Sequence, residues 1–232
     1  NTKNAPMLKI KVRKTKLNMG GIDMVLQDIN QALQRGDVNG VKQGVQEALD
    51  NNLEPRQILV DGLLSAMEVI GVKFKNNEVF VPEVLIAARA MNAGMELLKP
   101  KLVETGVKPI GNVVLGTVKG DLHDIGKNLV RMMFEGVGLT VFDLGVDVSA
   151  EKFVEAIQEH DPEIVGLSAL LTTTMGEMKK VIQAIEDAGL RDKVRIMVGG
   201  APVTSKFAQE IGADLYAKDA AEASFEAKKL VQ

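Results

Sequence analysis

The spacing of apolar residues changes near the middle of the chain, from a helical period to short extended runs. In 22-IDMVLQDINQALQRG-36 the apolar residues recur at intervals of three and four, which is typical of an amphipathic helix. The same pattern predicts helices over 22–36, 38–51, 55–74 and 82–100. Pro100 is expected to end or kink the fourth helix, because its ring crowds the preceding turn. Short connections between four such helices predict an antiparallel four-helix bundle.

From about residue 107 the apolar runs become short and rich in β-branched residues. The predicted strands cover 110–118, 140–145, 163–170, 193–200 and 213–217. Helical patterns follow these strands near 125–138, 149–160, 175–189, 203–211 and 219–231. This alternation predicts an α/β fold with a doubly wound, five-stranded parallel sheet of the flavodoxin-like, Rossmann-like kind. We therefore expect a leader over 1–20, a helical bundle over 21–105 and an α/β domain over 106–232.

Composition narrows the classes of function. The net charge of -3 provides no general attraction to nucleic acid or acidic membranes, and no apolar run approaches the roughly 18 residues that span a bilayer. The absence of cysteine excludes disulfides, thiolate metal sites and cysteine nucleophiles, and it is compatible with the cytoplasm, where we expect the protein. Residues 1–20 carry six Lys/Arg and no acid, which fits a flexible leader better than a nucleic-acid arm.

The stretch 116-GTVKGDLHDIGKNLV-130 follows the first predicted strand and contains His123, one of two histidines. Ligands of open parallel sheets bind beyond the carboxyl ends of the strands, so this loop is a candidate site. His123 could act as a general base toward a hydroxyl such as Ser168, or join an all-protein metal site, although His160 lies in another segment. It could also be an axial ligand to a macrocycle that supplies its own equatorial nitrogens. A structural role as a helix cap stays open.

Asp121 favours an axial-ligand role for His123, which lies two residues later. A ligating imidazole usually donates its other ring N–H to a carboxylate, which fixes its tautomer. The nearby Gly116, Gly120 and Gly126 permit close backbone approach. Their spacing is not that of a dinucleotide fingerprint or a phosphate-binding P-loop, so they indicate no nucleotide site.

Three short motifs occur in order. The stretch 121-DLHDIG-126 is followed after 41 residues by 168-SAL-170, and after a further 28 residues by 199-GG-200. Asp-x-His-x-x-Gly, Ser-x-Leu and Gly-Gly in this arrangement resemble the cobalamin (B12)-binding domain family. The stretch 79-VFVPEVLIAARAMNAGMELLKP-100 resembles the helical cap that precedes this domain. The whole of 20–232 therefore resembles the corrinoid proteins of methyltransferase systems, which are similar to the cobalamin modules of methionine synthase.

The resemblance implies specific roles for the motif residues. His123 would be the lower axial ligand of cobalt through Nε2, in the base-off, His-on state, and Asp121 would accept the other imidazole N–H. The third member of this relay is usually a serine, and the matching Thr174 keeps the hydroxyl but adds a methyl group. The pocket for the displaced nucleotide tail would include Ser168, Leu170, Thr172, Gly199 and Gly200, and Gly126 of the first motif would also bind the cofactor. An apolar lid over the corrin would be formed by Phe80, Val84 and Met91.

Simpler structural roles are the alternatives for several of these residues. Leu170 could be a core residue, and Gly199 and Gly200 could form a tight turn after a strand. Val84 and Met91 could belong to the bundle core.

The function implied by the resemblance is that of a methyl carrier, a non-catalytic subunit that binds cobalamin or a related corrinoid. A donor-specific methyltransferase would supply the methyl group, and a second would pass it to tetrahydrofolate or coenzyme M. Both partners are expected to be barrel proteins, with a reductive activase as a third, and with neither nucleic acid nor membrane. The bundle would move about a hinge near 100–111. A cobalamin-dependent sensor, a fragment of a larger B12 enzyme and a cofactor-free α/β enzyme are the alternatives.

Overall fold

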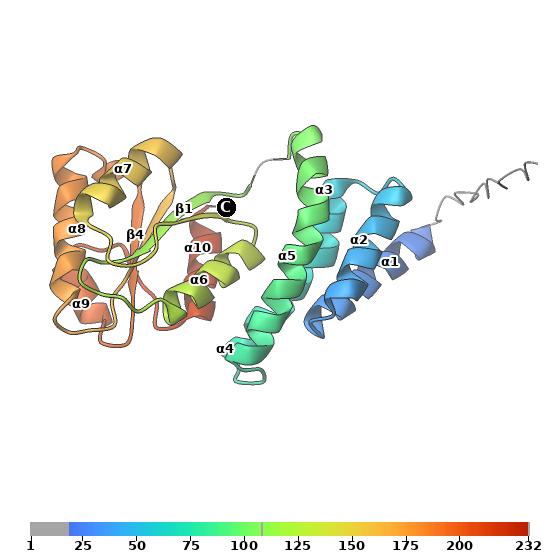
Figure 1. Ribbon diagram of the computed structural model, residues 1–232, viewed down its shortest axis with the longest axis horizontal. Coiled ribbons are helices and arrows are strands. Elements are labelled where there is room, and N and C mark those ends of the chain that lie inside the picture. Colours follow the sequence, from blue (N-terminus) through green and yellow to red (C-terminus); the bar gives the residue numbers. More distant parts are fainter. Residues whose placement is uncertain (1–18, 108, 232) are drawn as a thin grey trace, which may run out of the picture.

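The computed structural model describes residues 19–107 and 109–231, so the predicted leader over 1–20 lies almost wholly outside them. A helical bundle and an α/β domain lie side by side (Figure 1). The bundle, called the cap below, consists of α1 (Met19–Gln34), α2 (Val38–Asp50), α3 (Pro55–Gln57), η1 (Ile58–Leu64), α4 (Ser65–Lys75) and α5 (Val81–Glu104).

The helix predicted over 55–74 is continuous but not uniform, because η1 between α3 and α4 is a π-helix. The fourth predicted helix is longer than expected. Pro100 does not end α5, which continues to Glu104. Leu98 and Leu102, on either side of Pro100, are both buried in the cap, and their packing offsets the hydrogen bond that proline cannot make.

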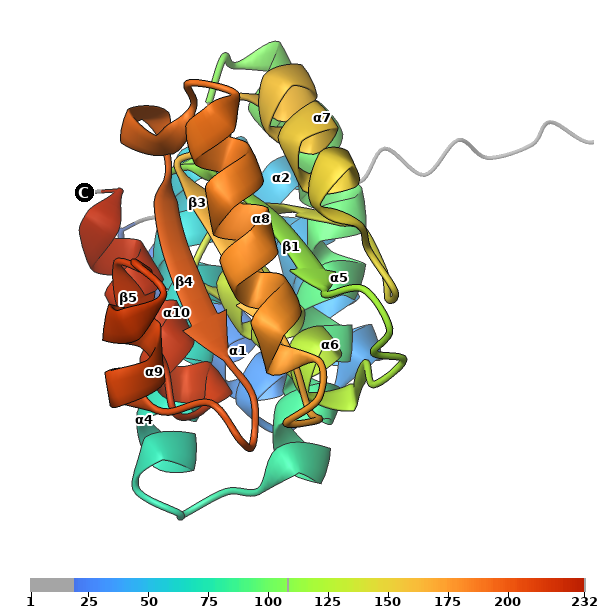
Figure 2. The same cartoon turned by 90° about the vertical axis from the view of Figure 1, so that its left-hand side faces the viewer.

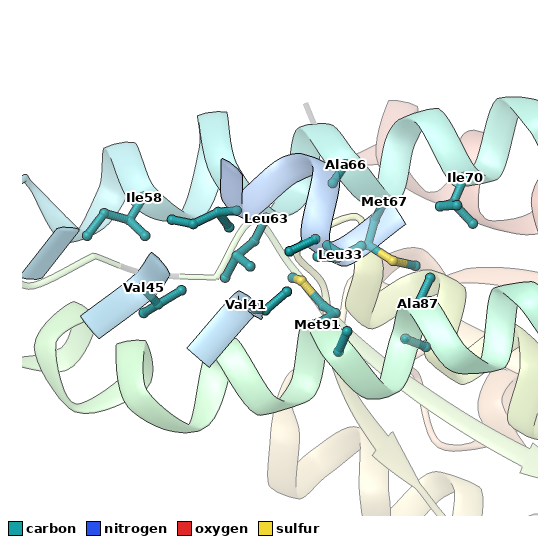
Figure 3. Close-up of a cluster of buried hydrophobic side chains, with 14 of the residues drawn as sticks. Leu33, Val41, Val45, Ile58, Leu63, Ala66, Met67, Ile70, Ala87 and Met91 are labelled. Carbon is teal, nitrogen blue, oxygen red and sulfur yellow. The ribbon is translucent and has the colours of Figure 1, made fainter. Parts of the chain in front are cut away.

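One apolar cluster holds the cap together (Figure 3). The buried residues of the longer helices recur at intervals of three and four, for example Val41, Val45 and Ala48 in α2, as the sequence pattern predicts. The labelled members of the cluster in the close-up are Leu33, Val41, Val45, Ile58, Leu63, Ala66, Met67, Ile70, Ala87 and Met91. Met133 of the second module belongs to the same cluster, so the cap core extends to the neighbouring domain.

The second module has the predicted parallel sheet. Its five strands lie in the order β2-β1-β3-β4-β5, which confirms the flavodoxin-like topology. The strands are β1 (Asn112–Thr117), β2 (Thr140–Asp143), β3 (Ile164–Ser168), β4 (Arg195–Gly199) and β5 (Leu215–Tyr216). The helices are α6 (Ile125–Gly136), α7 (Ala150–His160), α8 (Met175–Asp187), η2 (Arg191–Lys193), α9 (Ser205–Glu210) and α10 (Ala220–Leu230).

Both faces of the sheet are covered. Successive strand residues point to opposite faces, so Val113 packs with α6 and α10 while Val114 packs with α7 and α8. Figures 1 and 2 show that the cap lies against α6 and α10, on the side of the sheet away from α8. The strand order reverses between β1 and β3, so the loops after these two strands meet at one edge.

Candidate functional site

Three loops meet beyond the carboxyl ends of β1, β2 and β3. Thr117 at the end of β1 is in register with Ser168 at the end of β3, which places the Asp121–His123 loop beside the loop after β3. The Thr117 hydroxyl donates to the His123 carbonyl at 2.9 Å and so holds the returning end of the first loop. The parallel sheet thus brings together motifs that are far apart in the sequence.

Asp121 is the centre of this arrangement and is fully buried. Its Oδ1 lies 2.7 Å from His123 Nδ1 and accepts a second hydrogen bond from the His123 backbone N–H at 3.1 Å. Its Oδ2 accepts from the Thr174 hydroxyl at 2.7 Å and from the backbone N–H groups of Leu170 at 2.8 Å and Leu171 at 3.2 Å. The His–Asp–Thr relay is therefore present as a set of direct contacts.

The carboxylate is ionised despite its burial. Burial raises the pKa of the Asp121 carboxyl, but the hydrogen bonds from Thr174, His123 and Leu170 outweigh this effect and hold the pKa well below its usual range. An ionised carboxylate only accepts hydrogen bonds, so Nδ1 of His123 is the donor in this contact, and in the neutral ring the lone pair is on Nε2.

His123 presents this second nitrogen to the outside of the loop. Its side chain is 49% exposed, and Nε2 has no hydrogen-bond partner among residues 19–107 and 109–231. The Thr174 hydroxyl donates to Asp121 and is not positioned by His123 as a nucleophile would be. Within the described part of the chain, no group of three or more His, Asp or Glu side chains is placed to hold a metal. The exposed Nε2 of His123 suits a metal that takes one ligand from the protein and its other ligands from a macrocycle.

A cavity of about 520 Å³ opens beside His123, between the ends of β1, β3 and β4 and the helices α6 and α10. Its wall includes five residues that were predicted from the sequence to bind the cofactor, namely Gly126, Ser168, Leu170, Gly199 and Gly200. Glycine at 199 lets the chain after β5 approach β4 closely, since a Cβ there would lie 3.1 Å from the Ala217 carbonyl oxygen. Most of the residues that line this cavity are apolar or glycine, which suits a ligand with apolar parts.

Gly200 also has the structural role that the sequence left open. Its φ of 134° is outside the range of other residues, and a Cβ there would lie 1.9 Å from the carbonyl oxygen of Ala169. Gly200 therefore both forms a tight turn and lines the cavity, so the two interpretations of this residue are compatible.

The remaining candidates are placed elsewhere. Thr172 is exposed and does not line the cavity. Val84 and Met91 are buried in the cap core, where Figure 3 shows Met91 beside Val41, while Phe80 is exposed at the start of α5. In this structure the three proposed lid residues do not share one surface.

Three apolar residues that line the same cavity as His123 were not predicted from the sequence. Leu122 and Ile125 are 72% and 82% exposed on either side of the histidine, and Phe74 reaches the cavity from α4. The signal available for the first two was a large apolar side chain within two residues of the candidate ligand, in the loop for Leu122 and at the first position of α6 for Ile125. Exposed apolar residues at one site indicate a surface that binds an apolar partner or ligand.

Both modules match known families. Residues 111–227 and residues 25–99 each match a family described as a B12 binding domain. A corrinoid protein of Desulfitobacterium hafniense (strain Y51) is 40% identical over 210 residues, which cover 89% of this chain and 97% of that protein. A dimethylamine corrinoid protein of Methanosarcina barkeri is 45% identical over 189 residues, which cover 81% of this chain and 88% of that protein.

Two solved structures are similar to this chain over most of its length. The methanol:cobalamin methyltransferase complex from Methanosarcina barkeri contains a chain with a TM-score of 0.81 and 30% identity, matched over 94% of this chain and 86% of that one. A cobalamin-binding protein from Desulfitobacterium hafniense DCB-2 has a TM-score of 0.74 and 34% identity, over 89% and 98%. The chain therefore belongs to the family of B12-binding corrinoid proteins of methyltransferase systems, in which a helical cap precedes a cobalamin-binding α/β domain.

Proposed function

We propose that this protein is a methyl carrier that binds cobalamin or a related corrinoid base-off, with His123 Nε2 as the lower axial ligand. The single observation that supports this most is the orientation of His123. Its Nδ1 is held by a buried, ionised carboxylate while Nε2 is left free at the mouth of the cavity. When bound, the corrinoid supplies the cobalt on which the methyl group travels.

The protein's own residues would orient the ligand and accommodate the cofactor. Asp121 holds the His123 ring in one tautomer and makes Nε2 a better donor to a metal, while Thr174 holds Asp121. The cavity behind His123 would take the displaced nucleotide tail, with Ser168 and the glycines at its wall. Leu122 and Ile125 would cover apolar parts of the ring and exclude water.

The proposed partners are methyltransferases. One structural relative comes from a methanol:cobalamin methyltransferase complex, and other relatives are named dimethylamine or trimethylamine corrinoid proteins. A donor-specific enzyme would therefore load a methyl group from a small methylated compound. A second methyltransferase would pass it to tetrahydrofolate or coenzyme M, and a reductive activase would restore oxidised cofactor.

Access for these partners requires the cap to move. Since α5 continues to Glu104 and β1 begins at Asn112, the hinge would lie between these residues. The contacts of α4 and α5 with α6 and α10 would have to open with it.

The axial-ligand assignment is tested by reconstitution with cob(II)alamin. Electron paramagnetic resonance should show splitting from one nitrogen in the wild type and none from protein in His123→Gly, because only that imidazole is placed to reach the metal. His160→Gly is the matched control. His160 is the last residue of α7, near the start of β1 and stacked on Phe142, so it lies at the amino ends of the strands, away from the site. Protein-nitrogen splitting that persists in His123→Gly would refute the assignment.

A further inference from the structure

Asp147 lies outside every motif described above, in the loop between β2 and α7, yet it contacts the Asp121–His123 loop twice. Its Oδ1 accepts a hydrogen bond from the Gly120 backbone N–H at 2.7 Å. Its own backbone N–H donates to the Asp121 carbonyl at 3.0 Å. The two bonds bracket the peptide unit that joins Gly120 to Asp121.

The loop that carries Asp147 is itself fixed to the end of β1. Thr117 donates its N–H to the Gly145 carbonyl, and Val148 donates to the Thr117 carbonyl, both at 3.0 Å. Val118 and Val148 form an isolated parallel bridge. The chain after β1 and the chain after β2 thus pair again beyond the regular strands. This pairing fixes the position of the backbone at Asp147 relative to the sheet.

The backbone of Asp147 makes these contacts in a conformation that few residue types adopt. Its φ of 54° is in the left-handed region, which residues other than glycine, asparagine and aspartate rarely adopt. Such conformations persist only where the surroundings hold them, and they gather at functional sites. Here the left-handed turn brings the N–H and the carboxylate of one residue to the same loop.

We propose that Asp147 is a positioning residue for the cobalt ligand. The backbone of Asp121 is held by Asp147 from the loop after β2, and its side chain is held by Thr174 from the loop after β3. The Asp121 carboxylate can direct His123 only if both the backbone and the side chain of Asp121 are fixed. Asp147 therefore acts on His123 through Asp121, without touching the cofactor. This inference rests on the proposed axial role of His123.

The test compares three substitutions in protein reconstituted with cob(II)alamin. Asp147→Gly removes the carboxylate while tolerating the left-handed backbone, and Asp147→Asn keeps an oxygen that accepts from Gly120. Asp161→Gly is the control, because Asp161 is also left-handed, with a φ of 43°, but caps the far end of α7. The ratio of His-bound to His-free cofactor is read from the nitrogen splitting along an acid titration.

Asp147→Gly should lower this ratio about tenfold, at the lower end of effects seen for outer partners of a metal ligand. Half-dissociation of the imidazole would then occur about one pH unit higher, since weaker ligation yields to protonation sooner. Asp147→Asn and Asp161→Gly should behave as the wild type. Wild-type ligation in Asp147→Gly, or equal weakening in Asp161→Gly, would overturn the positioning role.

A measurement without cofactor separates this inference from the proposed function. Amide hydrogen exchange at Gly120 should speed up in Asp147→Gly apoprotein and stay slow in Asp147→Asn, because only the first loses the acceptor. If the wild type shows no His123-dependent splitting, the proposed function fails, whatever the exchange rates are. If that splitting is present and unaltered by Asp147→Gly, the positioning role alone fails.

Discussion

At the scale of single residues, the site depends on a buried charge that is fully satisfied. Asp121 accepts hydrogen bonds from His123, Thr174, Leu170 and Leu171, so its two oxygens have partners on both sides. The methyl group that distinguishes Thr174 from the expected serine does not disturb the relay. It faces Gly120, where even an added Cβ would lie 3.7 Å away. A threonine can therefore hold the carboxylate here.

Replacing Thr174 with valine should destabilise the protein by about 1.5–3 kcal/mol at neutral pH, because a buried carboxylate loses a charge-assisted hydrogen bond. The pKa of Asp121 is lowered by folding, so this stabilisation is present above the ordinary carboxyl pKa. It is lost as the pH falls toward the lower folded value. Urea unfolding at a series of pH values measures both effects.

Thr174→Ser is the matched control, since it keeps the hydroxyl and loses only the methyl group. It should remain within about 1 kcal/mol of the wild type. Equal stability of Thr174→Val and Thr174→Ser at neutral pH would contradict the importance of this hydrogen bond.

At the scale of elements, α6 starts directly after the Asp121–His123 loop and carries a buried ion pair in its first turn. Lys127 Nζ lies 2.6 Å from both oxygens of Asp143 at the end of β2, and its side chain is 2% exposed. A cation near a helix start opposes the helix dipole, so Asp143 offsets an unfavourable position. The pair ties the start of α6 to the sheet.

Asp143→Asn should cost about 3–5 kcal/mol of stability, because it leaves the Lys127 charge buried without its counter-charge. The double variant Lys127→Met with Asp143→Asn should recover most of this loss, since the buried charge is gone. Guanidinium denaturation of the single and double variants provides the comparison. A double variant as unstable as Asp143→Asn would show that the ion pair is not the cause.

At the scale of the whole molecule, the cap and the α/β domain share a core. Met133 of α6 is buried in the cap cluster, and Gly136 allows Met67 of α4 to approach closely, since a Cβ at 136 would lie 2.7 Å from the Met67 side chain. A salt bridge of 3.5 Å between Lys228 and Glu68 lies at the edge of this contact and is too exposed to contribute much. The apolar packing therefore holds the modules together.

Met133→Ala should destabilise the protein by about 2–5 kcal/mol and loosen the cap from the domain, because the lost side chain fills the shared core. Hydrogen exchange in α4 and α10 should rise. Met178→Ala is a suitable control, because Met178 is equally buried but belongs to α8, on the face of the sheet away from the cap. Similar exchange in α4 for both variants would mean that Met133 does not join the modules.

The placement of helices, strands and motifs followed from local patterns, and the errors came from distant packing. All five strands lie within the predicted ranges, because β-branched runs between turns are a local signal. Pro100 was expected to end or kink its helix, and the helix does not end there, because buried leucines on both sides keep it packed in the cap. Met91 has the period expected of a lid residue, but period alone cannot say which neighbour an apolar face meets.

In the described residues, no helix is both long and apolar enough to cross a membrane. By itself, the sequence determined the order of the elements and the identity of the histidine loop, because both depend on neighbouring residues. The family resemblance already implied that Thr174, 53 residues away, holds Asp121, but only the tertiary structure showed that Asp147 of another loop holds it as well. The strand order brings these loops together, and no local pattern encodes that contact.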